Sequence, residues 1–184
     1  MKKIIVLVGI HGSGKSTLGR KLEKEGFPFF SEIGAELRKY SSCNVSQKQE
    51  DFDALVMKKE LERDKQIECL DSIPVIESWH IGNIAFAEAR NSSNILYQYK
   101  RKLFDQLEIF YPYIINLEIS KETFLKRVNE KLISPNDAWL FYLKQKKYTD
   151  KIVEMIVSQC YASLLDINNC NWLKDINKKI KNMR

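Results

Sequence analysis

Glycine, lysine and hydroxyl residues are concentrated in one short segment near the start of the chain. This segment, Gly9-Ile10-His11-Gly12-Ser13-Gly14-Lys15-Ser16, meets in full the Walker A pattern G-x-x-x-x-G-K-[ST]. Its glycines let the backbone turn tightly and direct successive N–H groups at an anion, and its lysine supplies a positive charge for the β and γ phosphates of a nucleotide. The pattern therefore predicts a triphosphate site, which we expect to bind ATP with Mg²⁺.

The side chains of this loop divide the expected contacts among them. The hydroxyl of Ser16 is placed to bind Mg²⁺, and Thr17 can hydrogen-bond a neighbouring phosphate. Lys15 is expected to offset the charge that develops during phosphoryl transfer. At the loop tip, His11 either touches a phosphate acceptor or is an exposed bystander. An acceptor role would make the rate depend on pH near neutrality, where imidazole titrates.

Two acidic residues directly follow strand-like runs. Glu77 follows Ile73-Pro74-Val75-Ile76, and Glu32 follows Phe29-Phe30-Ser31. In open parallel sheets, ligands lie beyond the carboxyl ends of the strands. We therefore expect Glu77 to hold Mg²⁺ through water or to activate the nucleophile, and Glu32 to orient or deprotonate the acceptor. The alternative for each is a surface acid with no task.

Three further residues are expected at the acceptor side together with Glu32. Trp79 could stack on a planar molecule such as a nucleobase, and packing in the core is its equal alternative. Arg38 and Arg90 are expected on helices that start near the strand ends, where they could clamp an anionic acceptor. Arginines that simply face solvent are common, so that alternative stays open for both.

A basic segment later in the chain is a candidate lid. Arg127 and Lys131 are one helical turn apart and precede a break at Ser134-Pro135. Phosphoryl transfer needs positive charge over the migrating group, and a mobile segment can supply it only when both substrates are bound. We expect a lid around residues 127–137 with Arg127 as a catalytic residue. An ordinary charged helix face is the alternative.

Short strands that alternate with helices must position these residues. Apolar runs predict strands at residues 3–8, 27–31, 73–76 and 113–119, and a weaker strand at 163–167. Helical periodicity predicts helices after the phosphate loop as far as Gly26, at 47–70, 82–89 and 94–110, and from Ser120 onward. Pro112 is expected to end the 94–110 helix before the next strand begins. This alternation implies an α/β fold with a mostly parallel sheet covered on both faces.

Bulk properties fit one domain over residues 1–184. The chain is 44% hydrophobic, and no apolar run approaches the length of about 20 residues that a membrane-spanning helix requires. The four cysteines are scattered without a C-x-x-C pair, which favours a reduced, cytoplasmic protein with no metal cluster. The net charge of +6 suits polyanionic small substrates, nucleic acid or simply a solvated lysine-rich surface.

The chain resembles, over most of its length, the P-loop kinases of nucleosides and nucleotides, especially the thymidylate kinase and deoxynucleoside kinase group. The likeness is carried by the phosphate loop through Leu18, by Glu32, by Ile76-Glu77-Ser78-Trp79, by residues 112–118 and by Arg127. It implies a three-layer α/β/α P-loop NTPase fold with a five-stranded parallel sheet in the order 2-3-1-4-5. Residues 31–38 are also similar to the acceptor-side segment of adenylate-type kinases.

Two positions depart from the pattern of that group. Thymidylate kinases usually have aspartate where this chain has His11, and both groups usually have arginine where it has Ser78. Neither acceptor clamp therefore carries over intact. A nucleoside and a nucleoside monophosphate both stay open as the acceptor.

The leading functional hypothesis is a kinase that moves the γ-phosphoryl group of ATP to a small nucleoside-like or nucleotide acceptor. A rival is a P-loop switch or regulatory protein with slow nucleotide hydrolysis, although the N-K-x-D motif typical of GTPases does not occur. A third hypothesis, a kinase of nucleic-acid ends, predicts oligonucleotide binding that weakens steeply with salt. We expect a small molecule rather than nucleic acid or a membrane as the partner, and a homodimer stays open.

Overall fold

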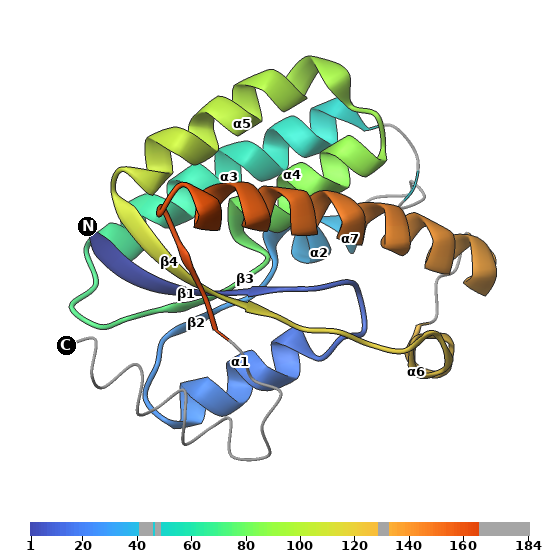
Figure 1. Ribbon diagram of the computed structural model, residues 1–184, viewed down its shortest axis with the longest axis horizontal. Helices are drawn as coiled ribbons and strands as arrows, with labels where there is room; N and C mark the ends of the chain where they lie inside the picture. Colours follow the sequence, from blue (N-terminus) through green and yellow to red (C-terminus); the bar gives the residue numbers. More distant parts are fainter. Residues whose placement is uncertain (41–45, 47–48, 129–132, 166–184) are drawn as a thin grey trace.

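Five parallel strands form the single sheet of the computed structural model, which describes residues 1–40, 46, 49–128 and 133–165. They are β1 (Lys2–Val8), β2 (Phe29–Phe30), β3 (Val75–Glu77), β4 (Phe110–Asn116) and β5 (Ser163–Leu164). Their order across the sheet is β2-β3-β1-β4-β5 (Figure 1). The predicted α/β fold and strand order are confirmed.

The central strand β1 determines where the site can form. Its residues pair in parallel register with both neighbours, Leu7 opposite Glu77 of β3 and Val8 opposite Asn116 of β4. From Ile4 to Leu7 every side chain is fully buried, as expected for a strand covered on both faces. The carboxyl ends of β1, β3 and β4 consequently lie at one edge of the sheet.

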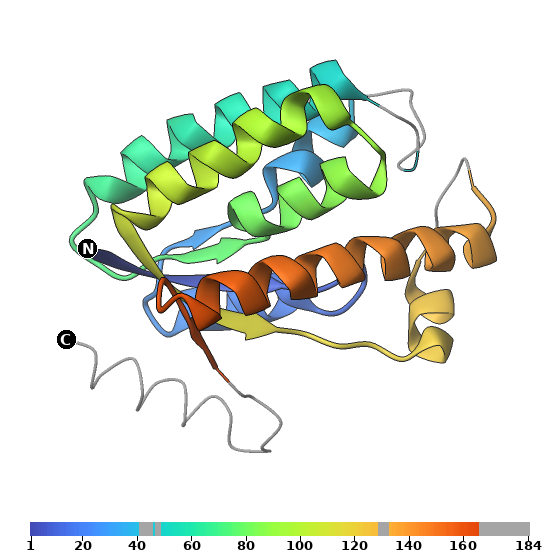
Figure 2. The same cartoon turned by 45° about the horizontal axis from the view of Figure 1, so that its top comes forward.

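Helices cover the two faces of this sheet unequally. Helix α1 (Lys15–Lys24) packs on one face, while α4 (Trp79–Ala89), α5 (Ser93–Leu107) and α7 (Pro135–Ser158) lie on the other (Figure 1). Helix α3 (Glu50–Glu68) runs beside α5 and α4 (Figure 2), and the short helices α2 (Ile33–Arg38) and α6 (Lys121–Arg127) follow β2 and β4. This arrangement is the predicted three-layer fold.

Alternate side chains of β1 enter two separate cores. Ile4, Val6 and Val8 join the core beneath α4, α5 and α7, whereas Ile5 and Leu7 pack with Leu18 and Leu22 of α1. The two-residue period of a strand thus fixes β1 to both helical layers.

The predicted boundary before β4 was wrong. The helix over 94–110 ends at Leu107, and the strand begins at Phe110, so Pro112 lies inside it opposite Ile4. Just outside β4, the Leu117 N–H donates to the Val8 carbonyl, and the Ile109 carbonyl accepts from the Lys2 N–H. Because backbone groups alternate in direction along a strand, the N–H and C=O groups of the odd-numbered residues of β4 point toward β1. The Pro112 nitrogen therefore faces the β5 side, where strand pairing starts only at Tyr113, so the proline removes no ladder bond.

Two serines begin the helices near the predicted lid. Ser120 accepts a hydrogen bond from the Thr123 N–H at 3.2 Å, and Ser134 accepts one from the Asp137 N–H at 3.1 Å. Both are N-caps, and Pro135 occupies the first turn of α7, as its fixed φ favours. The predicted helix start at Ser120 is confirmed, while Lys131 and part of the 127–137 lid lie outside the described residues.

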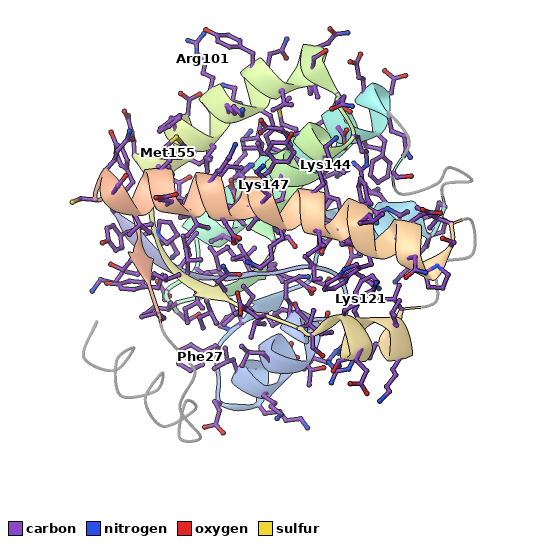
Figure 3. The ribbon with its side chains drawn as sticks, turned by 45° about the vertical axis from the view of Figure 1, so that its right-hand side comes forward. Phe27, Arg101, Lys121, Lys144, Lys147 and Met155 are labelled. Atoms are coloured by element: carbon purple, nitrogen blue, oxygen red, sulfur yellow. The ribbon has the colours of Figure 1, made fainter. Side chains whose placement is uncertain are left out.

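Helix α7 is tied to α4 by Lys144, which is labelled in Figure 3. Its ammonium donates a hydrogen bond of 2.8 Å to the carbonyl of Ala89 at the end of α4.

Within the described ranges, no helix is both long enough and apolar enough to cross a membrane.

Replacing Phe124 of α6 by alanine should destabilise the protein, because this fully buried ring packs against α7. Its ring centre lies 5.1 Å from that of Trp139 and 5.6 Å from that of Tyr142. The expected loss is about 3–5 kcal/mol of unfolding free energy, measured by urea denaturation. Leu125→Ala is the matched control, since its neighbouring side chain is 37% exposed. An equal loss in both variants would contradict this packing of α6.

Candidate active site

The phosphate loop connects β1 directly to α1, as the sequence predicts. Gly9, Gly12 and Gly14 all have positive φ, at 138°, 78° and 96°. These are backbone conformations that residues with a Cβ atom rarely adopt. At Gly9 a Cβ atom would also lie only 2.4 Å from the carbonyl oxygen of Leu117, so the loop passes the residue that follows β4 too closely for any side chain.

The ammonium of Lys15 lies inside this loop. Only 5% of the residue is exposed, and its Nζ donates hydrogen bonds to the carbonyls of Gly9 at 2.9 Å and Ile10 at 3.2 Å. It also lies 4.0 Å from a carboxylate oxygen of Glu77. A buried positive charge therefore sits where an incoming phosphate would meet it.

Ser16 and Glu77 face each other across the start of α1. The Ser16 hydroxyl lies 3.0 Å from both carboxylate oxygens of Glu77 and donates to them. Burial raises the pKa of Glu77, and the nearby charge of Glu32 adds to this rise, while Lys15 opposes it. A hydroxyl and a carboxylate are hard oxygen donors of the type Mg²⁺ prefers, so the pair fits the predicted metal ligands.

Glu32 approaches the same place from the end of β2. It is 7% exposed, and its Oε2 accepts a hydrogen bond of 2.8 Å from the Ser78 hydroxyl. Burial acts to raise its pKa, but the charges of Lys15 and Arg38 and the bond from Ser78 outweigh burial and hold the pKa below its usual value. Glu32 is consequently an ionised carboxylate at neutral pH.

Arg127 lies over the phosphate loop. It is exposed at the end of α6, and its guanidinium donates a hydrogen bond of 3.0 Å to the carbonyl of Gly12. The structure thus brings this predicted lid residue next to the loop.

One open cleft contains most of the predicted residues. Its volume is about 780 Å³, within the range of small-molecule sites. The lining includes the loop residues His11, Gly12, Gly14, Lys15, Ser16 and Thr17, together with Glu32, Glu77 and Arg127. Ile10 is buried beneath the loop, and Ser13 approaches Gly9 at its inner side.

The two arginines predicted for the acceptor side, Arg38 and Arg90, lie over the same two aromatic rings. The half-buried guanidinium of Arg38 lies 5.4 Å from the Phe86 ring centre and 5.8 Å from that of Phe52. In the described part of the chain it has no hydrogen bond or ion pair. Arg90 contacts the same two rings but is 4% exposed and paired with Asp53, so its role at an acceptor stays a prediction.

The prediction that Trp79 stacks on an acceptor needs correction. Helix α4 begins at Trp79, three residues earlier than predicted, and this turns the indole into the core with no exposed surface. Its Nε1–H donates a hydrogen bond of 2.9 Å to Asp64, and its ring meets Phe110 edge to face. The core-packing alternative is the one the structure has.

Two neighbours of the site make contacts that the sequence does not reveal. Ser78 donates to Glu32 from a left-handed backbone, at φ 65°. Tyr142 of α7 stacks on His11 with ring centres 5.7 Å apart, and this places His11 beneath an aromatic ring at the rim of the cleft. Serine and tyrosine are common residues, so only the fold reveals their positions.

Gly9→Ala should disrupt the loop because of both its φ and its contact with Leu117. We expect about 3–5 kcal/mol lower unfolding free energy, measured by urea denaturation, and loss of nucleotide binding. Gly26→Ala is the control, since Gly26 also has positive φ, at 94°, but a Cβ atom there would meet nothing within 4 Å. This control should lose about 1–2 kcal/mol. Equal losses would show that contact with Leu117 does not matter.

Comparison with known proteins agrees with this geometry. Residues 5–162 match the family model described as an AAA domain, and no curated protein matches the sequence. Among solved structures, the deoxyadenosine kinase of M. mycoides with dCMP and dCDP bound is similar at 17% identity and a TM-score of 0.68, over 98% of this chain and 99% of that chain. The Candida albicans thymidylate kinase is similar at 16% identity and a TM-score of 0.67, over 100% and 94% of the two chains.

A third similar structure is that of the NadR protein in complex with NR, at 12% identity and a TM-score of 0.66. The match covers 91% of this chain but 46% of that one. At these identities the likeness establishes a shared fold. Because the family model covers most of the sequence, the chain belongs to the AAA domain family, and it has the P-loop fold of nucleoside and nucleotide kinases.

Proposed function

We propose that the protein is an ATP- and Mg²⁺-dependent phosphotransferase whose acceptor is a small nucleoside-like molecule or a nucleoside monophosphate. The observation that carries this proposal is the ionised carboxylate of Glu32, buried in the same cleft as the phosphate loop and beside the charge of Lys15. A protein that only bound a nucleotide would have no need for a buried carboxylate there. A kinase can use one to orient its acceptor or, where the acceptor is a hydroxyl, to receive its proton.

Residues 9–17 form the donor side in this proposal. The loop N–H groups and the amino end of α1 bind the phosphates, and Lys15 turns from the Gly9 and Ile10 carbonyls to the β and γ phosphates. Ser16 and Glu77 hold Mg²⁺, which when bound neutralises part of the phosphate charge. Their hydrogen bond of 3.0 Å would open to admit the ion.

Transfer then follows from the positions of two side chains. The carboxylate of Glu32 accepts the proton of the acceptor hydroxyl, whose oxygen forms a bond to the γ phosphorus. The bond from that phosphorus to the β–γ bridging oxygen breaks, and ADP leaves. Arg127, the first residue of the proposed 127–137 lid, donates to the Gly12 carbonyl, and in this proposal its guanidinium would cover the migrating group with positive charge.

Arg38 is the residue we assign to the acceptor. Its guanidinium lies beside Glu32 and against Phe86, so it can bind a phosphate or the polar edge of a base. The ligands of the similar structures, dCMP and dCDP among them, support an acceptor of this size and kind. A nucleoside fits the proton transfer described above. A nucleoside monophosphate would attack through a phosphate oxygen that is already ionised, and Glu32 would then orient the acceptor instead of deprotonating it.

The proposal is tested by ADP formation from Mg-ATP with matched pairs of nucleosides and their 5′-monophosphates. We expect ADP to appear only when one of these acceptors is present. ADP formed at the same rate without any acceptor would indicate hydrolysis and a switch protein. ADP formed only with oligonucleotide ends would indicate a nucleic-acid kinase.

Lys15→Ala should abolish transfer while the protein stays folded, because its ammonium contacts loop carbonyls and adds little to the core. We expect the rate to fall by about 10²–10³-fold or more in a kinase assay. Lys24→Ala, on an exposed position of the same helix, should retain the wild-type rate. Unfolding of the Lys15 variant, monitored by circular dichroism, would contradict the assigned role.

Glu32→Gln should lower kcat by about 10²–10⁴-fold with little change in the KM for ATP, because glutamine accepts the Ser78 bond but cannot take a proton. The pKa of Glu32 is held below its usual value while that of Glu77 is raised, so the loss of wild-type activity on acidification should follow protonation of Glu77 and not of Glu32. Glu23→Gln, exposed on α1, serves as the control. An unchanged kcat for Glu32→Gln would exclude proton transfer to this residue.

A further inference from the structure

Helix α3 carries two buried charged residues at consecutive positions that do not line the cleft. Arg63 and Asp64 are both almost fully buried, and α3 packs against α2, α4 and α5. Burying a charged group is unfavourable unless it is paired and hydrogen-bonded. Their partners therefore indicate what these residues hold in place.

Arg63 holds the segment that leads into Glu32. Its Nη1 donates a hydrogen bond of 3.0 Å to the carbonyl of Ser31, the residue before Glu32. Its Nη2 forms an ion pair with Glu60, one turn earlier on the same helix. The guanidinium thus connects α3 to the end of β2.

Asp64 holds the segment that follows Glu77. One carboxylate oxygen accepts the hydrogen bond of 2.9 Å from Trp79 Nε1, and the other lies 2.6 Å from Nε2 of His80. Trp79 and His80 are the first two residues of α4, and both are fully buried. A single carboxylate therefore fixes the start of this helix.

The backbone between β3 and α4 requires such a restraint. Ser78 and Trp79 have φ values of 65° and 44°, in the left-handed region that is unfavourable for residues other than glycine. A conformation of this kind persists only where surrounding contacts determine it. Here it directs the Ser78 hydroxyl at Glu32, with an oxygen–oxygen distance of 2.8 Å.

The group formed by Glu60, Asp64 and His80 has the residue types of a metal site, but its oxygen atoms are already engaged. Glu60 accepts from Asn83 at 2.6 Å and pairs with Arg63, and both oxygens of Asp64 are bonded to α4. Asn83 also donates to the Trp79 carbonyl at 2.9 Å. This network serves the turn at Ser78 instead of an ion.

We propose that Asp64 is a positioning residue for Glu32, acting through the turn at Ser78. It fixes Trp79 and His80, these fix the left-handed backbone, and the Ser78 hydroxyl then orients the carboxylate in the cleft. Arg63 restrains the backbone just before Glu32 through its hydrogen bond to the Ser31 carbonyl. Neighbouring residues of one helix thus control both segments that meet at the bond between Ser78 and Glu32. The consequence for the rate rests on the proposed phosphotransfer function, whereas the structural link does not.

The kinetic test compares Asp64→Ala, Asp64→Asn and Ser78→Ala. Asp64→Ala should lower kcat by about 10–100-fold, as expected for a displaced catalytic group, and leave the KM for ATP within about twofold. Asp64→Asn should recover part of kcat: its Oδ1 can accept from Trp79, but its amide can donate to His80 only if the imidazole proton moves to Nδ1, which is buried without a hydrogen-bond partner in the described structure. Glu68→Ala, exposed one turn later on α3, is the matched control and should match the wild type.

A double variant separates positioning from general stabilisation. If Asp64 acts through Ser78, the Asp64→Ala/Ser78→Ala variant should lose no more of kcat than the more damaging single variant. Losses that multiply, or a wild-type kcat in Asp64→Ala, would overturn the proposal. If Asp64→Ala does not fold, Trp79→Phe can replace it, because it removes one of the two bonds to Asp64. This variant should lower kcat by a smaller factor, and it should not lower kcat further in the Ser78→Ala background.

Hydrogen–deuterium exchange provides a readout that needs no activity. Asp64→Ala should raise exchange in residues 29–38, which carry Glu32, as well as in 78–83. In the Ser78→Ala background it should add nothing in 29–38. A change confined to 78–83 would overturn the proposal. If the wild-type protein transfers no phosphate to any acceptor, the proposed function fails, and this measurement still decides the role of Asp64.

Discussion

The buried charge of Lys15 is the constraint on which the rest of the site depends. An ammonium that is 95% withdrawn from solvent needs carbonyl oxygens and negative charge around it. The Gly9 and Ile10 carbonyls provide the first, and Glu77 and Glu32 provide the second. These groups come from three strand ends, so the site exists only where β2, β3 and β1 are adjacent and parallel.

This requirement explains several otherwise unrelated features. Gly9 must be glycine because the loop that carries Lys15 passes against the Leu117 carbonyl. Ser78 must adopt a left-handed backbone because its hydroxyl reaches Glu32 from the end of β3. Arg63 and Asp64 of α3 support the segments next to Glu32 and Glu77, which bring these two carboxylates close to the Lys15 ammonium. Two nearby carboxylates with opposite pKa shifts, raised for Glu77 and lowered for Glu32, are suited to different tasks.

The part of this site that follows from local pattern could be predicted from the sequence. The phosphate loop is contiguous, Glu77 is the last residue of β3 and Glu32 lies shortly after β2, so their common location required only a parallel sheet. The strand order came from resemblance to known kinases, and the sheet confirms it. Pro112 was misleading, because it was expected to lie between the helix and the next strand, whereas a proline whose nitrogen faces the open side of a strand can lie inside that strand.

The contacts of the site that join segments far apart in the chain could not be predicted from the sequence. Trp79 and Arg90 look like site residues, but one turned backbone and one buried aspartate place them inside the protein. Arg63 and Asp64 look like surface residues on a charged helix, because a sequence does not show which charges find buried partners. Such pairings are made between segments far apart in the chain, and only the folded arrangement reveals them.

The central claim is that the cleft passes the γ-phosphoryl group to a bound acceptor and not to water. Its most direct test follows the label from γ-³²P-ATP in the presence of Mg²⁺ and a mixture of nucleosides and nucleoside monophosphates. The label should appear in a phosphorylated acceptor, with little inorganic phosphate. Label recovered only as inorganic phosphate, at a rate indifferent to the acceptors, would contradict it.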